Sequence, residues 1–437
     1  MKTVILGSGI SGVSCSYHLK LSGIESTIYE KDADWGGLCG NFTIDGFRFD
    51  RFVHFTFSKD EYTRNTFESS SECFSHKPEA SNYYNGTWLR HPAQNNLYPL
   101  SVEEKTKIIM SFIDNKDREN NEISNYEEWL KAQYGDFFSE KFPMKYTKKY
   151  WTVDANQLET KWVGNRMHKP SIEEVLKGSM QEHKEINYYT NEMRYPKKGG
   201  YKSIMNNMRK GLNIELNKEV IQIDTINKSI LFSDNTLVYY DSLVSSIPLT
   251  QIVKLIKNIP NEILKESKNL LCTSGYIISL GFNKSNIPKN LWFYIYDEEI
   301  LPSRVYSPSM KSSDNAPEGC SSLQTEIYFS KEFQLDMNEE QLLNHTINKL
   351  KEMKLFTDDD LIVKDIRKEE FANVVFTPKI YESREVIKSY LNKCGIELIG
   401  RFGEWDYLWS DQSFLSGKKI ADKIIKSYDI LEVMNEK

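Results

Sequence analysis

The first thirty residues alternate between short apolar runs and a glycine-rich turn. Val4 to Leu6 is an apolar run that predicts a buried strand, and Ser26 to Tyr29 predicts a second strand that ends at Glu30. Between them lies a stretch compatible with a helix, which opens with three glycines in the spacing G-x-G-x-x-G: Gly7, Gly9 and Gly12. The order of strand, glycine turn, helix, strand and acid predicts one βαβ unit that binds a dinucleotide.

Each residue of this motif has a physical task. Gly7 permits a tight turn after the strand, Gly9 lets a pyrophosphate approach the backbone, and Gly12 lets helix and strand pack closely. The N-terminus of the helix offers unpaired N–H groups to the phosphates, and Glu30 is placed to bind the ribose hydroxyl. The glycine spacing alone also occurs in turns without a ligand, so the flanking strands, helix and acid carry the prediction.

After Glu30 the pattern of apolar and polar residues changes at two places. Alternation over Phe42 to Phe49 predicts a hairpin, and the residues that follow it bring His54 close to the cofactor segment. A histidine here is more often structural than catalytic, but its position keeps it as a candidate. From about Ser81 to Glu192 glycines are few and aromatic residues many, and charged stretches predict a largely α-helical insertion.

The second half of the chain is dominated by predicted strands. Short apolar runs between Asn213 and Tyr240 predict a meander, and the run that ends before Pro248 predicts a buried strand. A weak helical signal covers Asp358 to Ile362, and near the C-terminus a strand runs into Gly400 and then a helix with small residues along one face. A second sheet is predicted from three further runs: Gly275 to Phe282, Leu291 to Tyr296 and Ser321 to Phe329.

These patterns predict an α/β fold in which a Rossmann-like FAD-binding domain is interleaved with a mixed helical and antiparallel-sheet substrate domain. The cofactor domain is expected to be discontinuous and to comprise residues 1–80, 191–260 and 370–437. The helical insertion is expected to cover residues 81–190, and the substrate-binding sheet and its helices residues 261–369.

Further glycines refine the nature of the dinucleotide. The doublets Gly36–Gly37 and Gly199–Gly200, and the turn at Gly400, are places where bare backbone can approach a phosphate or a flavin edge. A doublet just past the ribose acid is frequent in FAD-binding chains and has no special meaning in NAD-only enzymes. The predicted cofactor is therefore FAD.

The composition of the chain argues against several classes of protein. The 437 residues carry a net charge of -6, and the pI is near 5.8, which gives no general reason to expect nucleic-acid binding. Six widely spaced cysteines without a C-x-x-C pair predict neither a metal site nor a disulfide framework. No apolar stretch reaches the roughly 18 residues of a membrane helix, and the chain begins directly with a strand. We expect a cytoplasmic protein without membrane insertion, and a homo-oligomer is compatible with the sequence.

Together the motifs resemble the FAD-dependent superfamily of protoporphyrinogen oxidases, amine oxidases and UDP-galactopyranose mutases, and the resemblance runs from end to end. Within it the local motifs are most similar to the galactopyranose mutases, particularly the longer eukaryotic-type ones. These motifs are Pro92 with Gln94, Asn95 and Asn96; Tyr146, Lys149 and Trp151; Trp162, Gly164 and Arg166; Tyr195, Pro196, Gly199 and Gly200; Arg304 and Tyr306; and Arg401, Trp405 and Tyr407.

The resemblance implies which residues bind FAD, with His54 near the flavin N5 and NADH or NADPH as the candidate reductant. The implied cofactor-binding residues are Gly7, Gly9, Ser11, Gly12, Glu30, Lys31, Gly36, Gly37, Leu38, His54, Val220, Gly400, Arg401, Asp411, Gln412 and Ser413.

The resemblance also implies the reaction, which interconverts the pyranose and furanose forms of a nucleotide sugar for surface polysaccharide biosynthesis. It proceeds by covalent catalysis at N5 of reduced flavin. Arg166 and Arg304 would clamp the departing diphosphate, because guanidinium groups stabilise the charge that develops there. The implied catalytic residues are His54, Arg166, Arg304, Tyr306 and Tyr407; the implied substrate-binding residues are Asn95, Asn96, Trp162, Arg166, Arg304, Tyr306 and Tyr407.

The sequence departs from the mutases in two places. The loop around Arg304 is shorter than theirs, and Asp411 stands where they carry an asparagine. An unpaired aspartate would repel a sugar diphosphate, so a substrate other than UDP-galactose stays open. Two alternatives remain. One is an oxidase or desaturase of the amine oxidase or protoporphyrinogen oxidase type, which needs an apolar cage in place of an arginine pair. The other is a flavin-bound chain that serves as a structural partner in polysaccharide assembly.

Overall fold

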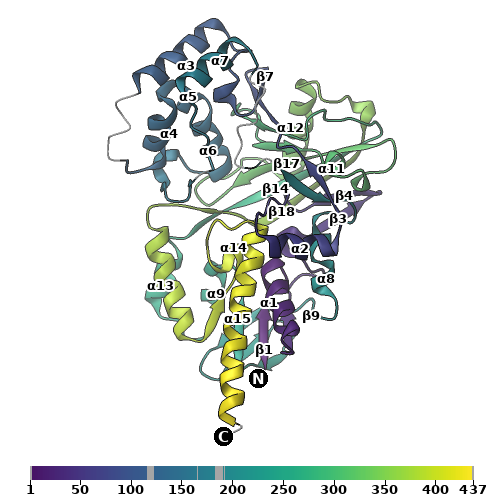
Figure 1. The fold of residues 1–437 in the computed structure, drawn as a ribbon, viewed down its shortest axis with the longest axis vertical. Coiled ribbons are helices and arrows are strands. Elements are labelled where there is room, and N and C mark those ends of the chain that lie inside the picture. Colours follow the sequence, from purple (N-terminus) through teal and green to yellow (C-terminus); the bar gives the residue numbers. More distant parts are fainter. Residues whose placement is uncertain (1, 116–122, 165, 183–189, 191, 436–437) are drawn as a thin grey trace.

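The computed structural model describes residues 2–115, 123–164, 166–182, 190 and 192–435. Figure 1 shows a sheet with its helices in the lower half, a second sheet above it, and a group of helices at the upper left. The predicted α/β class, with a Rossmann-like half interleaved with a mixed helical and sheet half, is confirmed.

The lower half is built around a five-stranded parallel sheet in the order β19–β13–β1–β2–β9, which gathers segments from both ends and the middle of the chain. Val4, Ile5 and Leu6 on the central strand are completely buried, as expected for a parallel strand covered on both faces. The strands are β1 (Thr3–Leu6), β2 (Ser26–Tyr29), β9 (Asn213–Glu215), β13 (Ser242–Ser245) and β19 (Ile396–Leu398).

Two helices from opposite ends of the chain, α1 (Ile10–Leu21) and α15 (Ser410–Asn435), lie side by side against this sheet (Figure 1). Their close approach depends on a small residue, because a Cβ atom on Gly417 would lie only 2.2 Å from the carbonyl oxygen of Ser11. The small residues predicted along the C-terminal helix therefore let α15 reach the fingerprint helix. The other helices of this half are α2 (Glu61–Ser70), α8 (Asn206–Arg209), α9 (Leu249–Leu255), α10 (Asn261–Ser267), α13 (Ile380–Lys393) and α14 (Gly400–Gly403).

Three small antiparallel sheets accompany the two large ones. The predicted meander is confirmed for β10–β11–β12, but its expected first strand, at Asn213, is β9 of the parallel sheet; the predicted hairpin is confirmed as β3 and β4. A third pair joins β5 to β8. The strands are β3 (Asn41–Ile44), β4 (Phe47–Asp50), β5 (Cys73–His76), β8 (Met193–Pro196), β10 (Val220–Asp224), β11 (Ser229–Phe232) and β12 (Leu237–Tyr239).

The upper half contains a seven-stranded sheet in the order β18–β14–β17–β16–β15–β6–β7. The three predicted strands of the second sheet are confirmed as β14, β15 and β17. The predicted helix at Asp358–Ile362 is wrong beyond one short turn, because β18 begins at Leu361 and pairs along β14. The strands are β6 (Ala80–Tyr84), β7 (Thr87–Arg90), β14 (Leu271–Phe282), β15 (Trp292–Ile295), β16 (Arg304–Tyr306), β17 (Ser321–Phe329) and β18 (Leu361–Val375); α11 (Pro308–Lys311) and α12 (Glu339–Glu352) accompany them.

The predicted insertion is helical over most of its length, but it does not begin as a helix. Its first residues form β6 and β7, and β6 pairs in parallel with β15, so this stretch belongs to the large sheet. Alternate residues Ala80, Asn82 and Tyr84 are buried, which is the period of a strand. The helices are α3 (Val102–Asp114), α4 (Tyr126–Tyr134), α5 (Asp136–Lys141), α6 (Pro143–Trp151) and α7 (Ile172–Met180).

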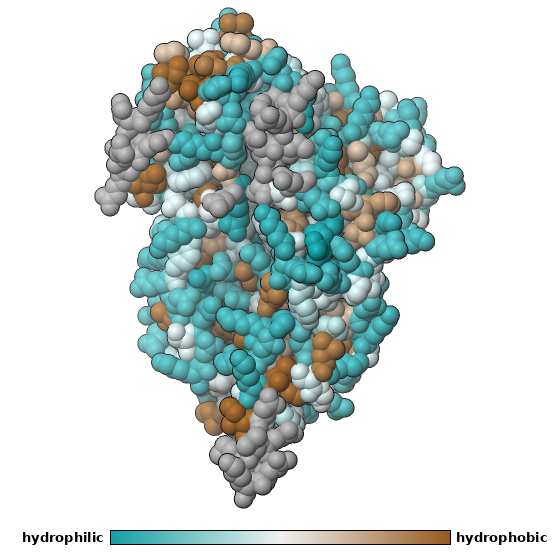
Figure 2. All heavy atoms as spheres, viewed as in Figure 1, coloured by the Kyte–Doolittle hydropathy of each residue, from teal (hydrophilic) through white to brown (hydrophobic). Residues whose placement is uncertain are grey.

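Figure 2 shows a mainly polar face with apolar side chains gathered at the top, over the helical insertion, whose exposed apolar residues include Val102, Met110 and Met180. Within the described ranges, no helix combines the length and the apolar character that a membrane span needs. The same ranges contain no group of three His, Cys, Asp or Glu side chains that could hold a metal ion.

Candidate active site

A cavity of about 2020 Å³ lies where the parallel sheet, the large mixed sheet and the helical insertion meet. Its wall includes the fingerprint residues Gly7 and Gly9 at one place and Trp162 and Arg166 of the insertion at another. The cavity therefore connects the predicted cofactor segment with the predicted substrate residues.

The glycines of the fingerprint have the predicted geometry. Gly7 has a φ of +94° and its N–H donates to the carbonyl oxygen of Tyr29 over 2.8 Å, which closes the turn after β1. A Cβ on Gly12 would lie 2.0 Å from the oxygen of Gly7, so only glycine allows this helix to pack so closely. A Cβ on Gly9 would meet no protein atom within 4 Å. Gly9 thus borders open space at the uncapped N-terminus of α1, where a pyrophosphate fits.

Glu30 is held in place at the end of β2. Its carboxylate is buried and accepts the Ser8 N–H and the Ser8 hydroxyl, both over 2.8 Å. Gly37 packs so close to Gly9 that a Cβ on Gly37 would lie 3.1 Å from the Gly9 Cα. The first glycine doublet therefore lies directly against the fingerprint, in the position that the FAD prediction requires.

Most of the predicted cofactor residues line the cavity. They are Gly7, Gly9, Ser11, Glu30, Lys31, Gly36, Gly37, Leu38, His54, Val220, Gly400, Arg401 and Ser413. Gly12, Asp411 and Gln412 are outside this lining. The exposed Gln412 side chain accepts the Trp409 N–H over 2.9 Å, and burial raises the pKa of Asp411, which sits in the first turn of α15. Asp411 is therefore not placed to repel a ligand in the cavity.

The second glycine doublet is not at the cavity, so the expectation of a flavin contact there is not met. Gly199 and Gly200 pack against protein atoms: the Gly199 N–H donates to Asp314 over 2.8 Å, and its carbonyl oxygen accepts from Asn41 over 2.8 Å. A Cβ on Gly200 would lie 2.4 Å from the Asn41 side chain. These glycines serve a close contact between loops.

His54 lines the cavity and stacks on Tyr201, with ring centroids 4.8 Å apart. Burial lowers the pKa of His54 to about 4, so its ring is neutral at neutral pH. Its Nδ1 lies 2.9 Å from the carbonyl oxygen of Phe52, which can only accept. The proton is therefore on Nδ1, and Nε2 is left as a hydrogen-bond acceptor.

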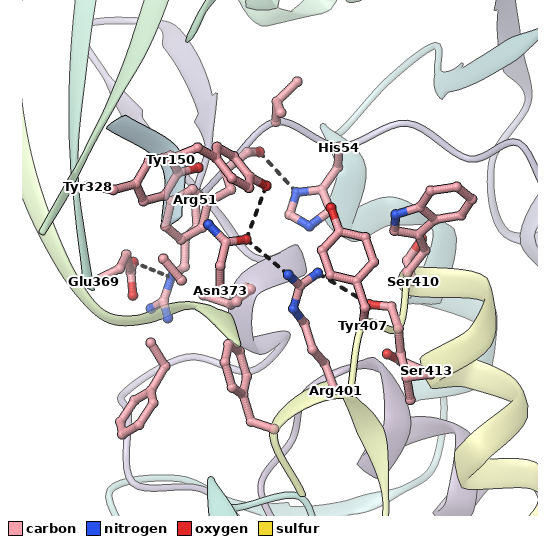
Figure 3. Close-up of a pocket in the computed structure, with 18 of the residues that line it drawn as sticks. Arg51, His54, Tyr150, Tyr328, Glu369, Asn373, Arg401, Tyr407, Ser410 and Ser413 are labelled. Atoms are coloured by element: carbon pink, nitrogen blue, oxygen red, sulfur yellow. Dashed lines mark hydrogen bonds and ion pairs between the residues drawn. The ribbon is translucent and has the colours of Figure 1, made fainter. Parts of the chain in front are cut away.

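Two arginines pack against the ring of Tyr407 (Figure 3 shows Arg401 beside it). The guanidinium of Arg166 lies 4.6 Å and that of Arg401 4.8 Å from the ring centroid. Arg166 donates to the carbonyl oxygen of Trp162, and Arg401 donates to the side-chain oxygen of Asn373 over 2.9 Å. Among the described residues both arginines have only neutral hydrogen-bond acceptors, so no carboxylate there cancels their charges.

Arg304 also lines the cavity, but its environment differs from the prediction. Its Nε and Nη2 donate to one carboxylate oxygen of Glu326, over 3.0 and 2.5 Å, and Glu326 is completely buried. Glu326 also accepts from Tyr328 over 2.7 Å and from the Val53 N–H over 3.1 Å. The positive charge of Arg304 is therefore balanced inside the protein.

Three predicted substrate residues lie away from the cavity wall. Tyr306 is fully buried, among Ala80 and Trp292, and burial raises its pKa well above the usual value. Asn95 and Asn96 are also buried; the amide of Asn95 donates to Glu174 and that of Asn96 to the Pro92 oxygen. All three have structural contacts here, whereas Trp162, Arg166, Arg304 and Tyr407 line the cavity together.

Sequence reasoning missed several residues of the site: Tyr150, Glu326, Tyr328 and Asn373. Asn373 had a usable signal, because asparagine is depleted in strands and this one stands in the apolar run Phe-Ala-Asn-Val-Val. Tyr150 follows Tyr146 by one helical turn, and both line the cavity from α6. Glu326 had no local signal in the sequence.

Residues 10–385 match the family described as flavin containing amine oxidoreductases, and the chain belongs to that family. Among solved structures, it is similar to a reduced UDP-galactopyranose mutase, with a TM-score of 0.91 and 24% identity over 97% of this chain and 95% of that one. It is also similar to a protein provisionally assigned as a protoporphyrinogen oxidase from Exiguobacterium sp. 255-15, with a TM-score of 0.76 and 16% identity over 98% and 99%. A redesigned putrescine oxidase has a TM-score of 0.67 and 12% identity over 97% and 99%.

The family and the site agree on a flavin dinucleotide. The open backbone at Gly9, the uncapped start of α1 and the buried carboxylate of Glu30 suit the pyrophosphate and ribose, while His54 and Arg401 line the cavity farther along. The structural similarities establish the fold, and they include one mutase and two proteins described as oxidases. The choice between these reactions depends on the chemistry of the cavity wall.

Proposed function

We propose that this protein is a flavin-dependent mutase that interconverts the pyranose and furanose forms of a nucleotide sugar, with a role in surface polysaccharide biosynthesis. The observation that carries the proposal is the positive, donor-rich wall around Tyr407. Arg166 and Arg401 contact this ring, and neither has a carboxylate partner among the described residues.

Unpaired polar atoms in the wall support an anionic ligand. Among the described residues that line the cavity, four side-chain polar atoms are buried without a hydrogen-bond partner, and all four are donors: Trp162 Nε1, Arg166 Nε, Asn373 Nδ2 and Arg401 Nε. Buried donors without acceptors are costly, and a ligand rich in oxygen acceptors relieves that cost. A sugar diphosphate is such a ligand.

The same wall argues against an amine oxidase. An amine substrate is a cation or a hydrogen-bond donor near neutral pH. It would meet the guanidinium groups of Arg166 and Arg401, which have no carboxylate partner among the described residues, and two further unpaired donors on other side chains. Porphyrinogen substrates require a large apolar cage, whereas this wall carries Arg166, Arg304 and Arg401. The oxidase alternative is therefore kept as an outcome of the experiment below.

Several residues of the cavity wall have a role in the proposed reaction. Reduced FAD, when bound, supplies the nucleophile that replaces the diphosphate at the anomeric carbon. Arg166 holds the diphosphate as its charge develops, with Tyr407 and Trp162 beside it. Arg304 contributes through its other N–H groups, since Glu326 accepts only one hydrogen bond each from Nε and Nη2. His54 offers the acceptor Nε2 to a proton of the cofactor or the sugar.

The proposal is tested with the purified holoenzyme. We expect a yellow flavin spectrum, and we expect the dithionite-reduced enzyme to convert a UDP-, GDP- or dTDP-sugar into a new isomer that chromatography separates. The oxidised enzyme is the matched control and should be inactive until it is reduced by dithionite, NADH or NADPH. Steady-state oxygen consumption with amines, or no new isomer from any of these sugars, would contradict the mutase assignment.

A further inference from the structure

Two arginines of the cavity wall are held by acceptors that differ in charge. Arg304 donates to the carboxylate of Glu326, whereas Arg401 donates from Nη2 to the amide oxygen of Asn373 over 2.9 Å. Carboxylate and carboxamide have nearly the same shape, so both can orient a guanidinium. They differ in that the carboxylate also cancels its charge.

A bulge in β18 places Asn373 at the cavity. Thr273 faces Asn373 and Gly275 faces Glu369, so β18 has two more residues than β14 between these pairs. The ladder is interrupted here, and the Asn373 N–H donates to the hydroxyl of Thr273 over 3.1 Å. Bulges of this kind re-aim side chains beside functional sites. The Asn373 side chain is only 4% exposed and belongs to the cavity wall.

The amide oxygen of Asn373 joins three separate segments of the chain. It accepts from Arg401 at the start of α14 and from the hydroxyl of Tyr150 on α6, the latter over 3.1 Å (Figure 3). Its own Nδ2 is buried and has no hydrogen-bond partner in the part of the chain that the structure describes. One neutral oxygen therefore connects the C-terminal flavin segment, the helical insertion and the large sheet.

A carboxylate at this position would accept the same two hydrogen bonds. It would also form a buried ion pair with Arg401, as Glu326 does with Arg304, and remove one positive charge from the wall. Among the described residues, no acidic side chain is paired with Arg401. The charge of Arg401 is thus available because residue 373 is an amide.

We propose that Asn373 is a positioning residue whose neutral carboxamide aims Arg401 and preserves its positive charge for an anionic group bound in the cavity. The inference rests on the proposed function only for the nature of this anion, which is either the reduced flavin or the diphosphate of the substrate. Both are anions that a guanidinium can contact, and the experiment separates them.

The test is Asn373→Asp in the holoenzyme, with two measurements besides turnover. One is the two-electron reduction potential of the bound flavin, and the other is the Kd for inorganic pyrophosphate, followed by protein fluorescence. We expect at least a tenfold effect on one of them, which for the potential is a fall of about 30 mV. A change in potential alone identifies the reduced flavin as the anion, and a change in Kd alone identifies the diphosphate.

Gln94→Glu is the matched control, because it adds the same charge to the wall of the same cavity on a residue that donates to the His168 oxygen and does not contact Arg401. We expect it to change both quantities less than threefold. If Asn373→Asp changes neither quantity, or changes them no more than Gln94→Glu does, the proposal is wrong.

A second variant covers the case in which Asn373→Asp does not fold. Asn373→Leu removes the hydrogen-bond acceptor but leaves the charge of Arg401 unchanged, so the guanidinium is no longer held in its orientation. We expect a weaker pyrophosphate affinity or a lower flavin reduction potential, with the flavin still bound. Unchanged values for Asn373→Leu would also overturn the proposal. If the wild type has no isomerase activity but Asn373→Asp has the expected effect, the proposed function is wrong and the inference about Asn373 remains supported.

Discussion

Arg166 and Arg304 were expected to act as equals, but their surroundings differ in charge. Arg304 lies directly opposite Glu326 in the pairing of β16 with β17, and the two side chains form a buried ion pair. Among the described residues, Arg166 donates only to backbone oxygens, and it packs on Tyr407 and Trp409. The same residue type therefore supports the fold at one position and leaves its charge to a ligand at the other.

This difference predicts a large loss of stability when Arg304 is removed and a small loss when Arg166 is removed. Arg304→Ala leaves the carboxylate of Glu326 buried without its cation, and we expect the free energy of unfolding to fall by about 3–5 kcal/mol. Arg166→Ala breaks no ion pair, and we expect a loss of less than about 1 kcal/mol. Urea unfolding of both variants measures this, and equal losses would contradict the assignment of charge.

For ligand binding we expect the opposite order, with the larger effect for Arg166→Ala and the smaller one for Arg304→Ala. We expect Arg166→Ala to lose about 1.5–3 kcal/mol of diphosphate interaction, the size of a hydrogen bond to a charged group, and Arg304→Ala to lose less than that in any folded fraction. Arg166→Lys should recover part of the loss because it keeps the charge. Kd values for UDP by fluorescence titration check this. An unchanged Kd for Arg166→Ala would remove that residue from the diphosphate site.

At the scale of elements, the fingerprint turn was the most predictable part of the molecule. Gly7, Gly9 and Gly12 act on neighbours within the same βαβ unit, so their spacing contains nearly all the needed information. The doublet Gly199–Gly200 has the same local appearance, yet it packs against Asn41 and Asp314. Whether bare backbone meets a ligand or another loop depends on what folds against it.

Two glycines of the fingerprint give a matched pair of substitutions. A Cβ at residue 12 would overlap the backbone oxygen of Gly7, so we expect Gly12→Ala to destabilise or unfold the domain. A Cβ at residue 9 enters open space beside the helix N-terminus, so we expect Gly9→Ala to keep the fold and lose FAD affinity. Thermal unfolding and the bound flavin per chain distinguish these outcomes. A Gly9→Ala protein with full flavin content would contradict the pyrophosphate site.

At the scale of the whole molecule, the site exists only because three parts of the chain meet. Lys149 on α6 shows how they are joined: its buried ammonium donates to the carbonyl oxygens of Ile295, Asp297 and Ile300, beside β15. This contact holds the helical insertion against the large sheet. Tyr146 and Tyr150, on the same helix, thereby reach the cavity.

The cavity also makes stability depend on pH. Burial lowers the pKa of both His54 and His91, which line the cavity, to about 4, against an ordinary value near 6.5. Between these values the unfolded chain binds protons that the folded protein does not, so stability is lost as pH falls from about 6.5 to 4. Each histidine contributes up to about 1.4 kcal/mol per pH unit in this range.

We therefore expect the free energy of unfolding of His91→Gln to depend less steeply on pH than that of the wild type. Near pH 5 the difference in slope corresponds to about one proton. Urea unfolding at several pH values between 4 and 7 measures the slope. Parallel profiles for wild type and variant would show that His91 is protonated equally in the folded and unfolded chain.

The sequence by itself determined the βαβ unit, the class of cofactor and some of the strands, including β14, β15 and β17 of the large sheet, because glycine spacing and apolar alternation act between residues close in the chain. It did not predict the other four strands of that sheet, β6, β7, β16 and β18. The tertiary structure alone decided which charges are free. Register between distant strands pairs Arg304 with Glu326, and a bulge in β18 brings Asn373 to Arg401 and Tyr150. Such pairings depend on the packing of the whole sheet, and a local pattern in the sequence does not record them.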